Sequence, residues 1–143
     1  MKSGFLACAL STLAAGGCAD PNADRVEPPP AQMPYLAVKL PPSTRKYYQY
    51  ESGLQHTMLQ LRFEMDPKDL PLFEKRLPCR LSAVATGPPE HGTVGTNDRA
   101  WYKAEDVKKH RECELTKGLR TGSVLVDLDH AERATVYAVI SSE

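Results

Sequence analysis

The sequence predicts one small domain of the α+β class, with an antiparallel sheet of about four or five strands, one or two short helices and a C-terminal β-hairpin. Three observations support this fold class. Apolar and polar side chains alternate along residues 59–65, which is the period of a half-buried strand. A single apolar stripe at helical spacing follows in residues 70–77. Two segments rich in Val, Leu and Ile, residues 123–128 and 134–141, flank a short polar loop near the end of the chain.

The first eighteen residues have the pattern of an export signal. Lys2 gives a charged start, an uncharged and mostly apolar run extends from Gly4 to Gly17, and small residues precede Cys18. A helix that crosses the hydrocarbon core needs about 20 apolar residues, so this run of about 14 is too short for a permanent span. The segment therefore predicts export rather than a transmembrane anchor.

Residues 15–18, with the sequence Ala-Gly-Gly-Cys, resemble the lipobox of bacterial lipoproteins. The resemblance implies removal of residues 1–17 and acylation of Cys18, and each methylene of the acyl chains contributes about 0.8 kcal/mol to membrane binding when buried. In this family an Asp directly after the cysteine favours the inner membrane. Here Ala19 holds that position, which implies the periplasmic face of the outer membrane. The alternative is ordinary secretion, because the same small residues satisfy the rule for a soluble secretory cleavage.

Residues 18–44 form the next segment, which is rich in proline and irregular. Consecutive prolines favour extended polyproline geometry of about 3.1 Å per residue, so we expect a lipidated cysteine followed by a semi-stiff tether of several nanometres. Only residues 35–38 are expected to pack on the domain. The globular domain itself is predicted to span residues 45–143, similar in plan to short lipoproteins of unknown function.

The domain begins with a β-prone run that contains three tyrosines and ends at Ser52-Gly53. In residues 59–65 the odd positions are apolar and should face the core. Asp69 is expected to cap a short helix that Pro78 stops, and Phe73 should pack on the apolar face of the preceding strand. Weaker signals suggest a short strand at residues 81–85, a second helix at 103–110 and a strand at 112–116.

Four cysteines occur, and two of them have fates outside the domain: Cys8 leaves with the signal and Cys18 carries the lipid. The remaining pair, Cys79 and Cys113, should form a disulfide in an oxidising compartment. Closing a loop of about 35 residues stabilises the fold by roughly 3 to 4 kcal/mol on the chain-entropy estimate. A metal or redox pair of His110 and Cys113 is the alternative, although a zinc site normally needs three or four ligands.

Charge excludes some partners. Basic and acidic residues number 18 each, and loss of the signal removes only Lys2, which leaves 17 against 18. This balance gives no footprint for nucleic acid and no polybasic patch for anionic lipid. Membrane attachment is expected through the lipid alone, and a protein partner is possible but not identified by the sequence.

No catalytic motif is recognisable, and no cofactor or metal is expected. Glu90-His91 is a candidate general base on a loop, although solvated loops ordinarily carry such polar residues. The cluster of Asp127, Asp129 and His130 offers oxygen ligands for a cation, but these residue types are also typical of turns. Trp101 and its neighbour Tyr102 are expected to be core residues, with an interaction hot spot as the alternative.

The sequence therefore favours a non-enzymatic, lipid-anchored envelope protein for protein binding or envelope maintenance. Two other classes are alternatives. An immunity lipoprotein would neutralise a toxin through one dense interface patch. A small secreted hydrolase would need a concave pocket that holds His91 or His110 beside a carboxylate.

Overall fold

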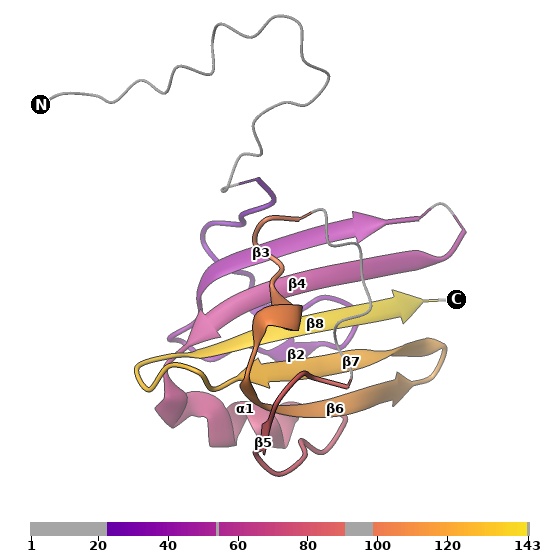
Figure 1. Ribbon diagram of the computed structural model, residues 1–143. Coiled ribbons are helices and arrows are strands. Elements are labelled where there is room, and N and C mark those ends of the chain that lie inside the picture. The colour runs from indigo at the N-terminus through magenta and orange to yellow at the C-terminus, as the bar shows by residue number, and fades with distance from the viewer. Residues whose placement is uncertain (1–22, 54, 91–98, 143) are drawn as a thin grey trace, which may run out of the picture.

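Figure 1 shows the computed structural model of the chain, which describes residues 23–53, 55–90 and 99–142. The predicted signal, Cys18 and His91 lie outside the described residues. The part of the chain that the structure describes contains one six-stranded antiparallel sheet, a two-stranded sheet and one short α-helix. This is broadly the predicted α+β class, with more strands than the sequence suggested.

The six strands of the large sheet follow one another, across the sheet, in the order β3 (Arg45–Ser52), β4 (Thr57–Met65), β8 (Ala134–Ser142), β7 (Arg120–Asp127), β6 (Lys109–Lys117) and β5 (Ala85–Thr86). The predicted C-terminal hairpin is confirmed as β7 and β8, paired antiparallel. β8 also pairs with β4 along its whole length. The last strand of the chain therefore joins the two halves of the sheet.

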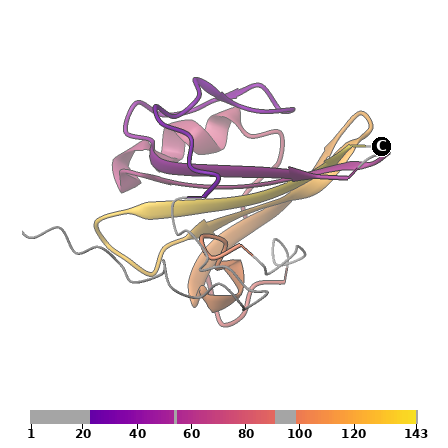
Figure 2. The ribbon, with the colours of Figure 1, turned by 90° about the horizontal axis from the view of Figure 1, so that it is seen from above.

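The smaller elements lie on the two faces of this sheet (Figure 2). The helix α1 (Leu70–Arg76), the preceding 3-10 turn η1 (Pro67–Asp69) and the two-stranded sheet of β1 (Gln32–Met33) and β2 (Val38–Lys39) cover one face. A loop with the 3-10 turn η2 (Ala104–Asp106) lies on the other. We call these the helix face and the loop face.

The helix face contains the larger apolar core. The predicted core side of β4 is confirmed, because the odd-numbered side chains from Leu59 to Met65 are fully buried there. The strand is not half-buried, however, since Gln60 and Glu64 on its other side are buried too. Phe73 of α1 is also fully buried, and its ring meets that of Phe63 edge to face at 5.6 Å. Arg111 of β6 donates two hydrogen bonds, of 2.7 and 3.0 Å, to the carboxylate of Glu74. These charge-assisted bonds connect α1 to strand β6.

The proline-rich segment differs from the expected spacer. Beyond the expected residues 35–38, Met33 and Leu40 are also buried in the core, 0% and 5% exposed. Residues 24–26 continue the pairing on the outer edge of β3, where Val26 N donates to Tyr47 O and Gln49 N donates to Asp24 O. Apolar side chains between the prolines give this segment enough buried surface to order it. The described part of the segment, from residue 23 onward, therefore belongs to the folded body.

Two local predictions also need correction. In place of a helix over 103–110, the chain makes the single turn η2 and enters β6 at Lys109. In place of a strand over 81–85, the two-residue strand β5 pairs with β6, and Ser82 N separately donates to Glu112 O. Asp69 stands at the N-cap of α1 as expected, but its carboxylate accepts a hydrogen bond from the Ser43 hydroxyl and does not cap the helix.

The predicted disulfide joins Cys79, just after α1, to Cys113 in β6, with Cα atoms 5.9 Å apart. It links the chain just after the C-terminal end of α1 to the sheet. His110 and Cys113 are three residues apart on one strand, so their side chains leave opposite faces of the sheet. This geometry contradicts a metal or redox site made by that pair.

Candidate functional site

Aromatic side chains cover the part of the loop face that lies over β3, β4 and β8. The rings of Tyr48 and Trp101 stack at 5.5 Å, and Tyr102 meets Trp101 and Tyr137 edge to face at 5.9 and 5.3 Å. All four residues are at most 8% exposed. Burial raises the pKa of both Tyr102 and Tyr137, so their hydroxyls stay neutral at physiological pH. The prediction that Trp101 and Tyr102 are core residues is confirmed.

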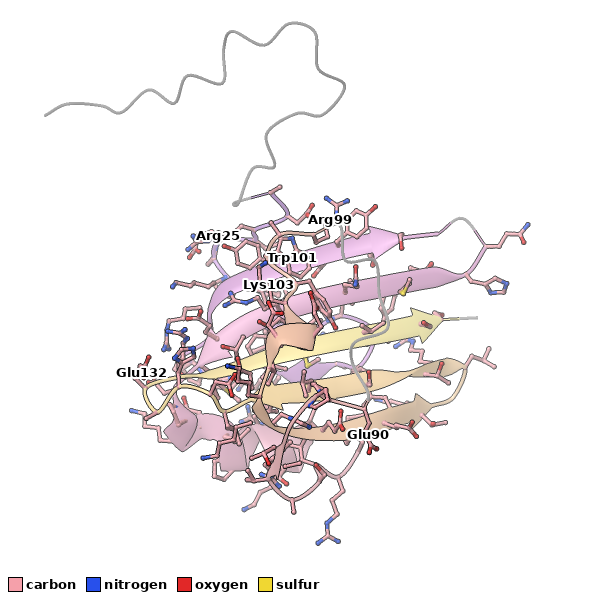
Figure 3. All side chains as sticks on the ribbon, in the orientation of Figure 1. Arg25, Glu90, Arg99, Trp101, Lys103 and Glu132 are labelled. Carbon is pink, nitrogen blue, oxygen red and sulfur yellow. A yellow bond between two sulfur atoms is a disulfide. The ribbon has the colours of Figure 1, made fainter. Side chains whose placement is uncertain are left out.

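An open pocket of about 340 Å³ lies beside this aromatic cluster. Its volume is near the lower end of the range for small-molecule sites, roughly 300 to 1,000 Å³. Figure 3 shows three of its lining residues, Arg25, Trp101 and Lys103, together over the β3 side of the sheet. The charged residues of the lining are four cations and one carboxylate: Arg25, Lys46, Arg62, Lys103 and Glu64. We call this the cationic pocket.

Glu64 of β4 is the buried carboxylate of the pocket, 3% exposed. Arg62 Nη2 donates to its Oε1 at 2.9 Å. Arg45, Lys46 and Arg133 place a side-chain nitrogen 3.8 to 3.9 Å from its oxygens. Arg45 and Arg133 each lie closer to a second carboxylate, Asp66 at 3.0 Å and Glu132 at 3.4 Å. Arg62 and Lys46 are thus left as two positive charges on one buried negative charge, which is more than its neutralisation needs.

A distortion of β3 brings two of these cations to the same carboxylate. The register of β3 against β4 shifts between Arg45 and Tyr48, and Lys46 has a φ of 50°, in the left-handed region that a side chain other than glycine rarely adopts. Successive side chains of a regular strand point to opposite faces. Here both Arg45 and Lys46 reach Glu64 Oε2, at 3.8 and 3.9 Å. Such conformations cost of order 1 to 3 kcal/mol and concentrate at functional sites.

The N-terminal segment holds the rim of the pocket in place. The Asp24 carboxylate accepts hydrogen bonds from Arg99 Nη1 at 3.1 Å and from Trp101 Nε1 at 3.2 Å. Arg25 bridges to Tyr48 on the edge of β3. Its guanidinium pairs with Glu27 at 3.3 Å, where the Arg25 side chain is 37% exposed and the Glu27 side chain 62% exposed. The first described residues of the chain are therefore part of the pocket wall.

Charge and hydrogen-bonding capacity suit the pocket to an anion. Of the three cations left in excess over Glu64, one is offset at the rim by Glu27, which leaves about two positive charges. Arg62 packs over the Tyr48 ring at 5.8 Å, which fixes its guanidinium. Cations held in fixed positions on a pocket wall bind an oxyanion more strongly than the same groups in free solution.

The other residues singled out from the sequence do not meet at this site. His110 is 1% exposed, and its Nε2 lies 3.8 Å from Glu112 Oε1 on the same strand. Asp129 accepts hydrogen bonds from the backbone of Lys108 and Lys109, and Asp127 accepts one from Asp129 N. Both carboxylates thus bind backbone amides, the ordinary role of Asp in a turn. In the described ranges, no three His, Cys, Asp or Glu side chains are grouped as metal ligands.

Sequence reasoning missed the cationic pocket. Its charged side chains come from four separate parts of the chain, and its buried carboxylate lies on the polar side of the β4 alternation. The equal numbers of basic and acidic residues in the whole chain gave no indication of the excess of basic side chains at this pocket. The one usable signal was the crowding of basic and aromatic residues at positions 45–50 and 99–103.

Comparisons with protein-family models, curated proteins and solved structures give no match. Among the described residues, no helix is long and apolar enough to cross a membrane.

Proposed function

We propose that this protein is a lipid-anchored, non-enzymatic binding protein of the cell envelope, which recognises an anionic group through the cationic pocket. The observation that carries the proposal is the surplus of cations around the buried Glu64, because such a surplus is stabilised when an anion is bound. Three features of the fold position these cations: the bulge in β3, the stacked rings of Tyr48 and Trp101, and the hydrogen bond from Trp101 to Asp24.

The anchor is proposed from the sequence. Acylation of Cys18 would attach the protein to the periplasmic face of the outer membrane, since Ala19 follows the cysteine. Cys79 and Cys113 form the disulfide that export to an oxidising compartment favours. The domain would then present its pocket to envelope components within reach of the anchor.

Photocrosslinking in intact cells tests the binding role. A photoreactive residue is placed at Lys103, on the pocket rim, and a matched one at Lys75, on the helix face. We expect the probe at position 103 to give adducts that the probe at position 75 does not give. These adducts should disappear when the other three cations of the lining, Arg25, Lys46 and Arg62, are neutralised together. The same adducts from both positions would contradict a binding role for the pocket.

The nature of the adduct separates this proposal from its main alternative. An immunity lipoprotein would give a protein adduct of defined mass only after exposure to a toxin. A binding protein of the envelope would give its adducts in unchallenged cells.

A further inference from the structure

The position of the pocket relative to the predicted anchor limits what it can meet. Asp24 is held on the folded body by its hydrogen bonds to Arg99 and Trp101. Only six residue steps separate it from Cys18. A fully extended chain spans at most about 3.3 to 3.6 Å per residue, so the link cannot exceed about 22 Å. Because Arg25 follows at once and lines the pocket, an acylated Cys18 would keep the pocket within reach of the membrane that holds it.

The charge of the pocket favours one class of headgroup. Its lining has about two positive charges that carboxylates of the site do not offset. A phosphomonoester carries about −1.5 to −2 charges at pH 7 and three acceptor oxygens, whereas a carboxylate or a phosphodiester carries one charge. The phosphomonoester therefore fits the lining better in charge and in number of acceptors.

The donors around the opening are also suitable. Arg62 offers a guanidinium fixed over a ring, and Lys46 is turned toward the same space by the bulge. Lys46 and Lys103 are exposed, so a headgroup can reach them without rearrangement of the core. Arginine forks and lysine ammonium groups are the side chains that bind phosphate in proteins.

We propose that the cationic pocket binds the phosphomonoester headgroup of a lipid in the membrane that carries the anchor. This inference rests on the proposed function, because it needs the acyl chains on Cys18. Bound headgroup and acyl chains would be two membrane attachments on one body, which fixes the orientation of the domain on the surface.

The test uses the full acylated chain reconstituted in phosphatidylcholine vesicles, with phosphatidic acid or phosphatidylglycerol added at matched surface charge. Trp101 is the single tryptophan of the chain and lines the pocket, so its emission reports occupancy. We expect an emission change that saturates with phosphatidic acid and is several-fold smaller with phosphatidylglycerol, whose phosphate is a diester.

Two triple variants serve as matched partners. Replacing Arg25, Lys46 and Lys103 by Gln removes three rim cations, and a basic residue near a membrane surface contributes about 1 kcal/mol, so affinity should fall by about a hundredfold. Replacing Lys68, Lys75 and Arg80 by Gln removes the same charge from exposed positions around the helix face and should leave the response unchanged.

Each contrary result has a separate meaning. Equal responses to the two lipids, or a full response in the rim variant, would overturn the proposal. The same change produced by inorganic phosphate added to plain phosphatidylcholine vesicles would assign the pocket to a soluble phosphate and overturn the lipid headgroup. If the chain does not float with the vesicles, the predicted anchor is contradicted. The proposed function and this inference would then both be wrong.

Discussion

Truncation of Phe73 gives the sharpest test of how the helix is held. Its side chain is fully buried under the sheet, and its ring packs edge to face on Phe63 at 5.6 Å. Removing a buried Phe costs about 3 to 5 kcal/mol, of which the aromatic pair contributes about 0.5 to 1.5 kcal/mol. Phe73→Ala should therefore lose about 4 kcal/mol in the free energy of unfolding, a large part of the 5 to 15 kcal/mol typical of a domain.

Urea unfolding with the disulfide intact measures this loss. With a slope of about 2 kcal/mol per M, the midpoint should fall by roughly 2 M. Leu72→Ala is the control, because Leu72 is the preceding residue of the same helix and is 47% exposed. It should cost below about 1 kcal/mol. Equal losses for the two variants, or a loss below about 1 kcal/mol for Phe73→Ala, would refute the packing of α1 on β4.

Three further outcomes follow from the fold. Denatured, unreduced mature protein should contain no free thiol from Cys79 or Cys113; two reactive thiols would contradict the bridge. Gly122→Ala should destabilise by at least about 1 to 3 kcal/mol, because the added Cβ would overlap the Val139 carbonyl oxygen; an unchanged urea midpoint would refute this. Burial raises the pKa of Asp127, so the folded state holds the proton more tightly and loses stability as the pH rises from about 3.8 through the raised pKa. Asp127→Asn should gain stability relative to the native chain from pH 3 to pH 7 in urea titrations, and a constant difference would contradict the sign.

The elements that local pattern controls were predictable. The alternation in β4 identified the buried side of the sheet, because a period of two follows directly from strand geometry. Val-rich and Ile-rich runs indicated the final hairpin, and the expectation of an oxidising compartment indicated the disulfide. These features depend on neighbours in sequence or on the compartment.

Features that depend on distant partners were not predictable. Glu64 lies on the polar side of its strand and is buried among basic side chains that come from β3, β4 and the loop before β8. Lys46 is not a glycine, so nothing in the sequence indicates its positive φ. Met33 and Leu40 could have indicated packing of the proline-rich segment, but the spacing of the prolines dominated that interpretation.

Both proposals depend most directly on the chemical state of Cys18. Intact-mass analysis of the mature protein, extracted from membranes, measures this state without disturbing the fold. We expect a chain that begins at Cys18 and carries the mass of its acyl groups, and Cys18→Ser should abolish acyl labelling and release the protein from membrane fractions. An unmodified mature N-terminus at Ala19 or Asp20 would contradict the anchor and the membrane-facing pocket together.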